Sequence, residues 1–345
     1  MEVIHQFGLN EKQTVLLFSM QRYIVTKDIE MEEKTTAKKR KQDWLNLWEQ
    51  GINDVLKKLK EPTDFIEEKD LFEESKNVVA DCNNYKMPLY LILLELSLFE
   101  PYFPIGELKW KFYERVKYPS SPDDPTLRNL AFMLEIDEEF IGRYKRSFKK
   151  SARSLSGTFK KILVGAGAGT LLLAITAGFA APIIGAWVAP AGLFGGAAMN
   201  AGLAALGGGA VAAGGLGISG GMAVIVGGGS IFGAMSGSAL GAILSSSSDY
   251  ALLEGAKLEV VMKEIILSSQ QDTRFAQELL EAQRKSIVEL EEELTELKFN
   301  EEENREKIKT LSKSIDLLRD VLNKSKSNFQ NYLDGVEVSE KKTNN

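Results

Sequence analysis

The chain of 345 residues is poor in two residue types from which many active sites are built. It contains one cysteine, Cys82, and one histidine, His5. A single cysteine excludes an internal disulfide, and one Cys with one His leaves too few ligands for a zinc site or a transition-metal cluster. We therefore expect no metal and no cofactor. The low cysteine count is also typical of a protein from a reducing compartment.

The scarcity of histidine also argues against two enzyme-like motifs. Residues 217–221 read G-x-S-x-G around Ser219, the form of a hydrolase nucleophile elbow, and a G-x-G-x-x-G match begins at Gly215. A serine nucleophile needs a histidine base, and only His5 is present, near the amino terminus. The second motif lacks the acidic residue about 20 positions onward that would hold a ribose. We predict that the protein is not an enzyme.

Charge is absent from one long stretch. Between Lys161 and Asp249 there is no Asp, Glu, Lys, Arg or His, and 23 of the 30 glycines lie there. A membrane-spanning helix needs about 20 apolar residues, so residues 162–248 could supply two to four crossings. We predict a multi-helix membrane region over this run, with an even number of crossings because both charged flanks are expected to be cytoplasmic.

Small residues recur at every fourth position within the uncharged run. Such ridges let helices approach closely in a bilayer, where apolar contact alone does not distinguish a helix from lipid. The ridges serve either to hold a helical hairpin together or to assemble several copies. The glycines predicted to pack membrane helices are Gly165, Gly169, Gly185, Gly217, Gly221, Gly229, Gly233, Gly237 and Gly241.

A segment without acidic residues leads directly into the run. Lys and Arg beside a membrane segment favour the cytoplasmic side and attract anionic lipid. A nucleic-acid-binding helix is the alternative, but no recognition motif accompanies the basic residues, so no nucleic-acid partner is expected. The side chains predicted to bind lipid headgroups are Arg143, Lys145, Arg146, Lys149, Lys150, Arg153, Lys160 and Lys161.

The first 150 residues show apolar positions at helical spacing and predict an all-α domain. The segment 87–99 is almost wholly apolar but too short to cross a bilayer, so we expect it to form a buried core helix. Trp110, Phe112, Phe132, Leu134 and Phe140 are expected to pack in the same core. Helices are expected over about 13–25, 29–59, 65–82, 87–99, 105–116, 126–134 and 137–147.

The charged segment after the run predicts an amphipathic helix over 250–267 and then a coiled coil. The polar stretch 300–305 interrupts the heptad register, which favours a helical hairpin over a continuous rod that would pair with another copy. The last residues are polar and expected to be disordered. The heptad positions are Leu280, Ile287, Leu290, Leu294, Leu297, Ile308, Leu311, Ile315, Leu318 and Leu322.

These segments define the expected organisation. The fold class is all-α, with a helical cytosolic domain (1–150), a polybasic collar (151–161), a glycine-zipper membrane region (162–248), amphipathic and coiled-coil helices (249–333) and a tail (334–345). The first residues do not have the basic-then-apolar pattern of a secretory signal. We expect a location at the cell inner membrane with both terminal regions cytoplasmic, and a conditional soluble form as an alternative.

The stretch from Gly165 through Pro182 to Gly196, with its Ala177–Pro182 core, resembles the membrane segment of the transmembrane-and-coiled-coil family of lipase-like proteins. The resemblance implies a helical amino-terminal region and membrane insertion. In that family an α/β-hydrolase domain follows the segment, whereas heptads follow it here, so hydrolase activity is not implied. The apolar run beside long amphipathic helices is also similar to α-helical pore-forming proteins.

Two functions are compatible with this organisation. The first is a non-enzymatic intracellular effector that inserts into the membrane, forms a homo-oligomer and permeabilises the bilayer, with a regulatory protein as a further partner. The second is a constitutive membrane anchor or scaffold that recruits partners through its helical domains.

Overall fold

The computed structural model describes residues 8–57, 63–102, 116–119, 121, 123–155, 241, 244–245 and 248–343. All regular elements in these ranges are helices and none is a strand, so the all-α prediction is confirmed for this part of the chain. Most of the uncharged run and nearly all of the predicted helix over 105–116, including Trp110 and Phe112, lie outside the described residues. The division into five segments stays a prediction.

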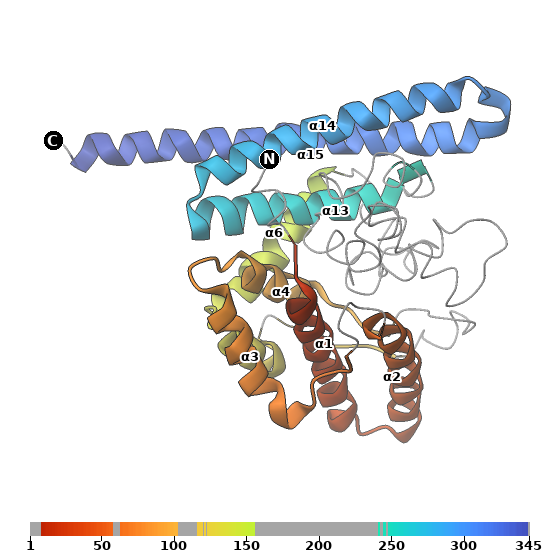
Figure 1. Cartoon of the computed structure of the whole chain (residues 1–345), viewed down its shortest axis with the longest axis vertical. Helices are drawn as coiled ribbons and strands as arrows, with labels where there is room; N and C mark the ends of the chain where they lie inside the picture. The colour runs from red at the N-terminus through yellow and green to blue at the C-terminus, as the bar shows by residue number, and fades with distance from the viewer. Residues whose placement is uncertain are drawn as a thin grey trace.

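The amino-terminal half forms a bundle (Figure 1). An Asn10–Gln13 capping box starts its first helix, which continues to Met31, beyond the predicted end at Val25. The chain then turns extended at Glu32, and the second helix begins later than predicted. The helices are α1 (Glu11–Met31), α2 (Thr35–Leu56), α3 (Glu68–Cys82), α4 (Met87–Leu98), α5 (Pro125–Met133) and α6 (Glu139–Leu155).

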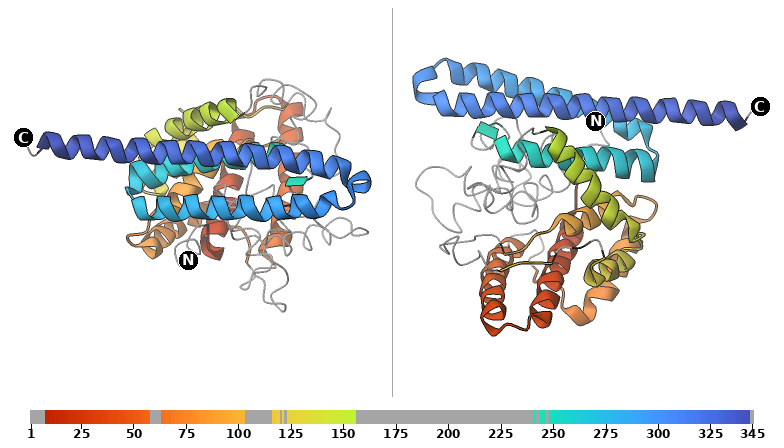
Figure 2. Two further views of the ribbon diagram at one scale, coloured as in Figure 1. Left: turned by 90° about the horizontal axis from the view of Figure 1, so that it is seen from above. Right: turned by 180° about the vertical axis from the view of Figure 1, so that it is seen from behind.

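The carboxyl-terminal half packs as a second group of long helices (Figure 1). Helix α13 (Ser248–Val260) runs directly into a π-helical segment, η5 (Val261–Gln270), and α14 (Thr273–Lys298) and α15 (Glu301–Thr343) follow. The chain reverses between α14 and α15, which lie side by side, so the preferred hairpin is confirmed (Figure 2). Helix α15 continues through residues 334–343, which are therefore helical rather than disordered as their polar composition predicts.

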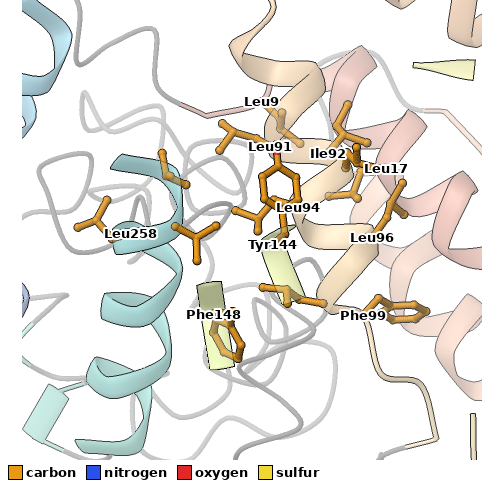
Figure 3. Close-up of a cluster of buried hydrophobic side chains, with 14 of the residues drawn as sticks. Leu9, Leu17, Leu91, Ile92, Leu94, Leu96, Phe99, Tyr144, Phe148 and Leu258 are labelled. Atoms are coloured by element: carbon orange, nitrogen blue, oxygen red, sulfur yellow. The ribbon is translucent and has the colours of Figure 1, made fainter. Parts of the chain in front are cut away.

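Helix α4 lies at the centre of the molecule and joins the two halves. It contacts α1, α3, α5, α6 and η5, and nearly all of its side chains are buried, as predicted for the 87–99 segment. Leu91, Leu94, Tyr144, Phe148 and Leu258 gather where α4, α6 and α13 meet (Figure 3). Because each fully buried Leu or Phe contributes about 1.5–3 kcal/mol, this junction helps to hold the two halves together.

The predicted core is correct for Leu134 and Phe140, which are buried, but wrong for Phe132. Phe132 is 69% exposed and stacks on Phe72 of α3, with ring centroids 6.4 Å apart. It follows the buried Ala131 on α5, so the helical turn directs its ring away from the core.

The predictions of transmembrane helices, of a pore-forming protein and of an inner-membrane location are wrong on the structure's evidence. Among the described residues, no helix combines the length and the apolar character needed to cross a bilayer. The apolar helix α4 has 12 residues and is therefore only about 18 Å long, well short of a hydrocarbon core of about 30 Å. The longer helices α14 and α15 carry charges along their length.

Candidate functional site

Helix α6 presents an aromatic face to the core and a basic face to the outside. Phe140, Tyr144 and Phe148 follow one another at four-residue spacing and are all buried. Phe140 packs against Tyr90 of α4 at 5.3 Å between ring centroids. Burial raises the pKa of the Tyr144 hydroxyl well above its usual value. The aromatic face thus fixes the rotation of α6 and determines which basic residues point outward.

Two of the predicted headgroup ligands are engaged in internal contacts. Arg143 Nη2 lies 2.7 Å from Glu264 Oε2 of η5 and 2.8 Å from Ser268 Oγ. Lys145 Nζ donates a hydrogen bond of 3.1 Å to the carbonyl oxygen of Ser121, and burial lowers the pKa of this amine. These two side chains hold α6 against its neighbours and are not part of the outward basic face.

Glu264 is the centre of the contact between α6 and η5. Its Oε1 accepts hydrogen bonds from Ser147 Oγ at 2.5 Å and from Lys263 Nζ at 2.9 Å, in addition to the contact from Arg143. Burial favours the neutral carboxyl, but the hydrogen bonds outweigh that effect and hold the pKa of Glu264 below its usual value. The carboxylate therefore stays charged and fixes the position of η5 beside α6.

Four predicted ligands remain on the outward face of α6: Arg146, Lys149, Lys150 and Arg153. All four are exposed, and their spacing of three, one and three residues places them on one side of the helix. None forms an ion pair with any residue in the described ranges. We call these four residues the basic face. Lys160 and Lys161 lie outside the described residues.

A polar groove adjoins the basic face where α6 meets α13, η5 and α15. Lys150 of the basic face also lines the groove, next to Ser154, and Lys263 and Lys324 enter the groove from η5 and α15. Lys324 Nζ donates a hydrogen bond to Ser154 Oγ. The view from behind shows α6 leaning from the amino-terminal bundle onto α13 and α15 (Figure 2). The groove therefore depends on the packing of the two halves of the chain.

One carboxylate lies in the groove. Ser151 Oγ donates a hydrogen bond to Glu259 Oε2, and both residues are buried. Burial raises the pKa of Glu259, while Ser151, Lys324 and Lys263 act in the opposite direction. Three lysines and this one acid line the groove, and Glu264 pairs with one of them, Lys263, so the groove keeps a small excess of positive charge.

A second ionic cluster is fully enclosed. Lys257 Nζ lies 3.2 Å from Glu95 Oε2 of α4 and 3.2 Å from Glu254 Oε1, and none of the three side chains is exposed. Burial opposes the charge of Lys257, but attraction to Glu254 and Glu95 outweighs it and raises the pKa of the amine. Because it has no access to solvent, this cluster orients α13 on α4 and has no route to a ligand.

The predicted heptad residues meet one another inside the α14–α15 hairpin. Six are buried in the structure: Ile287, Leu290, Leu311, Ile315, Leu318 and Leu322. Leu280, Leu294 and Leu297 are partly buried against the same core, and Ile308 is half-buried. Ser314 Oγ of α15 also donates a hydrogen bond of 2.8 Å to the carbonyl oxygen of Leu244. The structure therefore places these residues in contacts within one chain.

Of the predicted packing glycines, only Gly241 lies in the described ranges. It is buried, and a Cβ placed on it would lie 1.6 Å from Glu293 Oε2 of α14. The contact partner of this glycine is thus a carboxylate on the hairpin. The other eight glycines, Ser219 and His5 lie outside the described residues.

Sequence reasoning missed the residues that join the halves: Glu95, Lys257, Glu264, Lys263 and Lys324. A signal existed for the first, because Glu95 is the only charged residue in the apolar helix α4. A lone charge in such a helix needs a buried partner of opposite sign. Lys263 and Lys324 sit among many similar surface lysines and carried no such signal.

Within the described ranges, no group of three or more His, Cys, Asp or Glu side chains is arranged to hold a metal ion. Comparison with protein-family models, with curated proteins and with solved structures finds no match for this chain.

Proposed function

We propose that this protein is a non-enzymatic scaffold that docks on an anionic lipid surface through the basic face of α6 and recruits a protein partner through its helical hairpin. The observation that carries the proposal is the exposure of Arg146, Lys149, Lys150 and Arg153 on one side of a helix, without ion-pair partners in the described ranges. Uncompensated cations on one face attract an anionic surface. Docking of this kind needs no spanning helix and involves no permeabilisation.

The strength of such docking can be bounded. Each Lys or Arg near an anionic membrane contributes about 1 kcal/mol, so the basic face supplies about 4 kcal/mol. That corresponds to a dissociation constant of about 1 mM, which is too weak for stable docking by one copy. Two linked copies would double the interaction and reach the micromolar range. We therefore include a homo-oligomer in the proposal.

Vesicle co-sedimentation tests the lipid surface. We expect the full chain to bind phosphatidylcholine vesicles that contain phosphatidylserine, and to bind less as salt rises, because exposed charges are screened. The triple variant Arg146→Ala, Lys149→Ala, Arg153→Ala should lose at least tenfold in binding, since it removes about 3 kcal/mol. The matched control Lys38→Ala, Lys39→Ala, Lys57→Ala removes the same charge from the exposed surface of α2 and its end, and should bind normally.

Two results would contradict the proposal. One is equal binding of the triple variant and the control. The other is equal binding of the unmodified chain to neutral and anionic vesicles, because the basic face distinguishes them by charge. A duplex DNA competitor that displaces the vesicles at stoichiometric amounts would instead favour nucleic acid as the ligand of this face.

A further inference from the structure

We propose that the groove between α6, η5 and α15 binds a polyphosphorylated anion, either a phosphorylated lipid headgroup or a soluble polyphosphate. This inference rests on the proposed function, because it specifies the class of anion recognised beside the basic face. Its evidence is separate, however. The basic face is a row of charges on one helix, whereas the groove is a concave site to which three elements contribute cations.

The lysines of the groove come from different parts of the chain. Lys150 belongs to α6, Lys263 to η5 and Lys324 to α15. Only the tertiary fold brings these three amines around one space. Lysine acts as a point charge toward phosphate and carries three donors, so amines from three directions suit a ligand with several phosphate oxygens. A single carboxylate headgroup could engage only part of such a set.

Neutral polar side chains complete the lining. Ser147, Ser151 and Ser154 follow one another along α6, and α15 adds Ser327 and the amide of Asn328. Hydroxyl and amide groups donate hydrogen bonds to phosphate oxygens without adding charge. The three serine hydroxyls of α6 donate within the chain, Ser147 to Glu264, Ser151 to Glu259 and Ser154 to the carbonyl oxygen of Ser151. The neutral donors offered to a ligand are therefore the hydroxyl of Ser327 and the amide of Asn328. The groove thus combines charge with neutral donors, which a surface for non-specific attraction does not require.

Glu259, the one acid in the groove lining, is bound by Ser151 and lies near Lys263 and Lys324. Ser151 Oγ donates to Glu259, and the burial of this carboxyl raises its pKa. The hydrogen bond from Ser151 and the two nearby lysines offset part of the repulsion that this group would exert on an incoming anion. Lys263 also lies 2.9 Å from Glu264, a contact that the lysine can keep while its remaining donors face the groove.

The groove and the basic face share Lys150, so a ligand in the groove would lie next to a surface bound by the basic face. On a membrane, the basic face would lie on the general anionic surface while the groove holds one multiply charged headgroup. This arrangement predicts selectivity among anionic lipids, which attraction to the basic face alone does not provide.

The test compares vesicles of matched surface charge that contain either phosphatidylserine or phosphatidylinositol bisphosphate, and titrates the full chain with inositol hexakisphosphate. We expect tighter binding to the bisphosphate vesicles. Lys324→Ala should reduce that preference, or the affinity for the hexakisphosphate, by about tenfold, the usual effect of losing one charge-assisted hydrogen bond. Lys324→Arg should retain most of it. Lys313→Ala, an exposed lysine of the same helix outside the groove, is the matched control.

The vesicle comparison and the hexakisphosphate titration together distinguish a lipid headgroup from a soluble polyphosphate as the ligand. Hexakisphosphate binding without a vesicle preference assigns the groove to a soluble polyphosphate, and a vesicle preference assigns it to a lipid. The inference is overturned if neither ligand is preferred, or if both Lys324→Ala and Lys263→Ala keep the preference while circular dichroism shows a folded chain. In that case, phosphatidylserine binding that depends on Arg146, Lys149 and Arg153 would still support the proposed function. If instead only the dependence of phosphatidylserine binding on these three residues were absent, the proposed function would fail and the inference about the groove would still hold.

Discussion

Lys257 illustrates how a single buried charge constrains the whole fold. Its amine is enclosed between two carboxylates from α4 and α13, with all three side chains fully buried. A buried ion pair adds little net stability compared with apolar residues of similar volume, because desolvation offsets the attraction. It does, however, penalise any packing in which the charges are separated. We infer that this cluster selects one arrangement of α13 on α4.

We expect Lys257→Met to destabilise the protein by about 3–5 kcal/mol, because two carboxylates would remain buried without their cation. Urea denaturation measured by circular dichroism gives this value. The triple variant Glu95→Leu, Glu254→Leu, Lys257→Met should recover most of the loss. If the single variant were as stable as the unmodified protein, the cluster could not constrain the packing as described.

Glu293 makes the free energy of unfolding depend on pH. Burial and the neighbouring Glu296 raise the pKa of this carboxyl to about 7, and its side chain lies against Gly241. In the unfolded chain the group ionises near its ordinary value of about 4.3. Between these values the folded state binds more protons than the unfolded state, so the free energy of unfolding falls as pH rises toward about 7.

We therefore expect Glu293→Gln to raise the free energy of unfolding at pH 8 by roughly 1 kcal/mol, a value reduced for the partial exposure of the group. At pH 4 the variant and the unmodified protein should be nearly equal. Thermal denaturation at both pH values measures the difference. Glu296→Gln, which removes the neighbouring charge, should give a smaller gain. Equal effects of Glu293→Gln at the two pH values would contradict this assignment.

At the scale of the helices, close approach of α13 and α15 depends on one glycine. A Cβ placed on Gly255 would lie 2.5 Å from Val321 Cγ2, nearer than side chains tolerate. Glycine costs about 1 kcal/mol relative to alanine inside a helix, so its presence here indicates that the gain from close packing exceeds that cost.

We expect Gly255→Ala to destabilise the protein by about 1–3 kcal/mol despite the better helix propensity of alanine. The penalty should shrink or vanish in a Val321→Ala background, because the clashing methyl is then absent. A double-mutant cycle measured by urea denaturation detects this coupling. Gly335→Ala is the control, since nothing lies within 4 Å of a Cβ at that position of α15. Additive effects of Gly255→Ala and Val321→Ala would contradict the close approach.

Helix α6 shows how packing divides a uniform sequence pattern. Its basic residues are indistinguishable in the sequence, yet Arg143 and Lys145 bind inside the molecule and the four residues of the basic face point outward. The division follows from the aromatic residues, whose burial fixes the rotation of the helix. The helical wheel could identify the opposite faces of α6 but not the carboxylate on η5 that captures Arg143.

At the scale of the molecule, one continuous core joins the amino-terminal bundle to the α13–α15 group. Leu311 of α15 is fully buried, and α4, α6 and η5 connect its surroundings to the bundle that contains Trp44 and Trp48. Elements that share a core tend to unfold together. The two groups are therefore expected to behave as one cooperative unit.

We expect Leu311→Ala to lower the stability by about 2–5 kcal/mol and to shift the unfolding midpoint of the distant tryptophans with it. The measurement uses a chain with Trp110→Phe and Trp187→Phe, so that only Trp44 and Trp48 fluoresce. Fluorescence and far-ultraviolet circular dichroism should give one shared midpoint. A tryptophan midpoint that does not move would show that the bundle folds independently of the hairpin.

The sequence by itself determined the helical class, the buried apolar helix α4, the polar turn between α14 and α15 and the burial of Phe140. These features depend on residues close together in the chain, where periodicity and turn composition act directly. The tertiary structure alone decided that Phe132 is exposed, that Gly241 meets Glu293 and that Lys150, Lys263 and Lys324 share one groove. Each of these depends on partners more than 50 residues away or on the rotation of a packed helix, and local pattern carries no information about either.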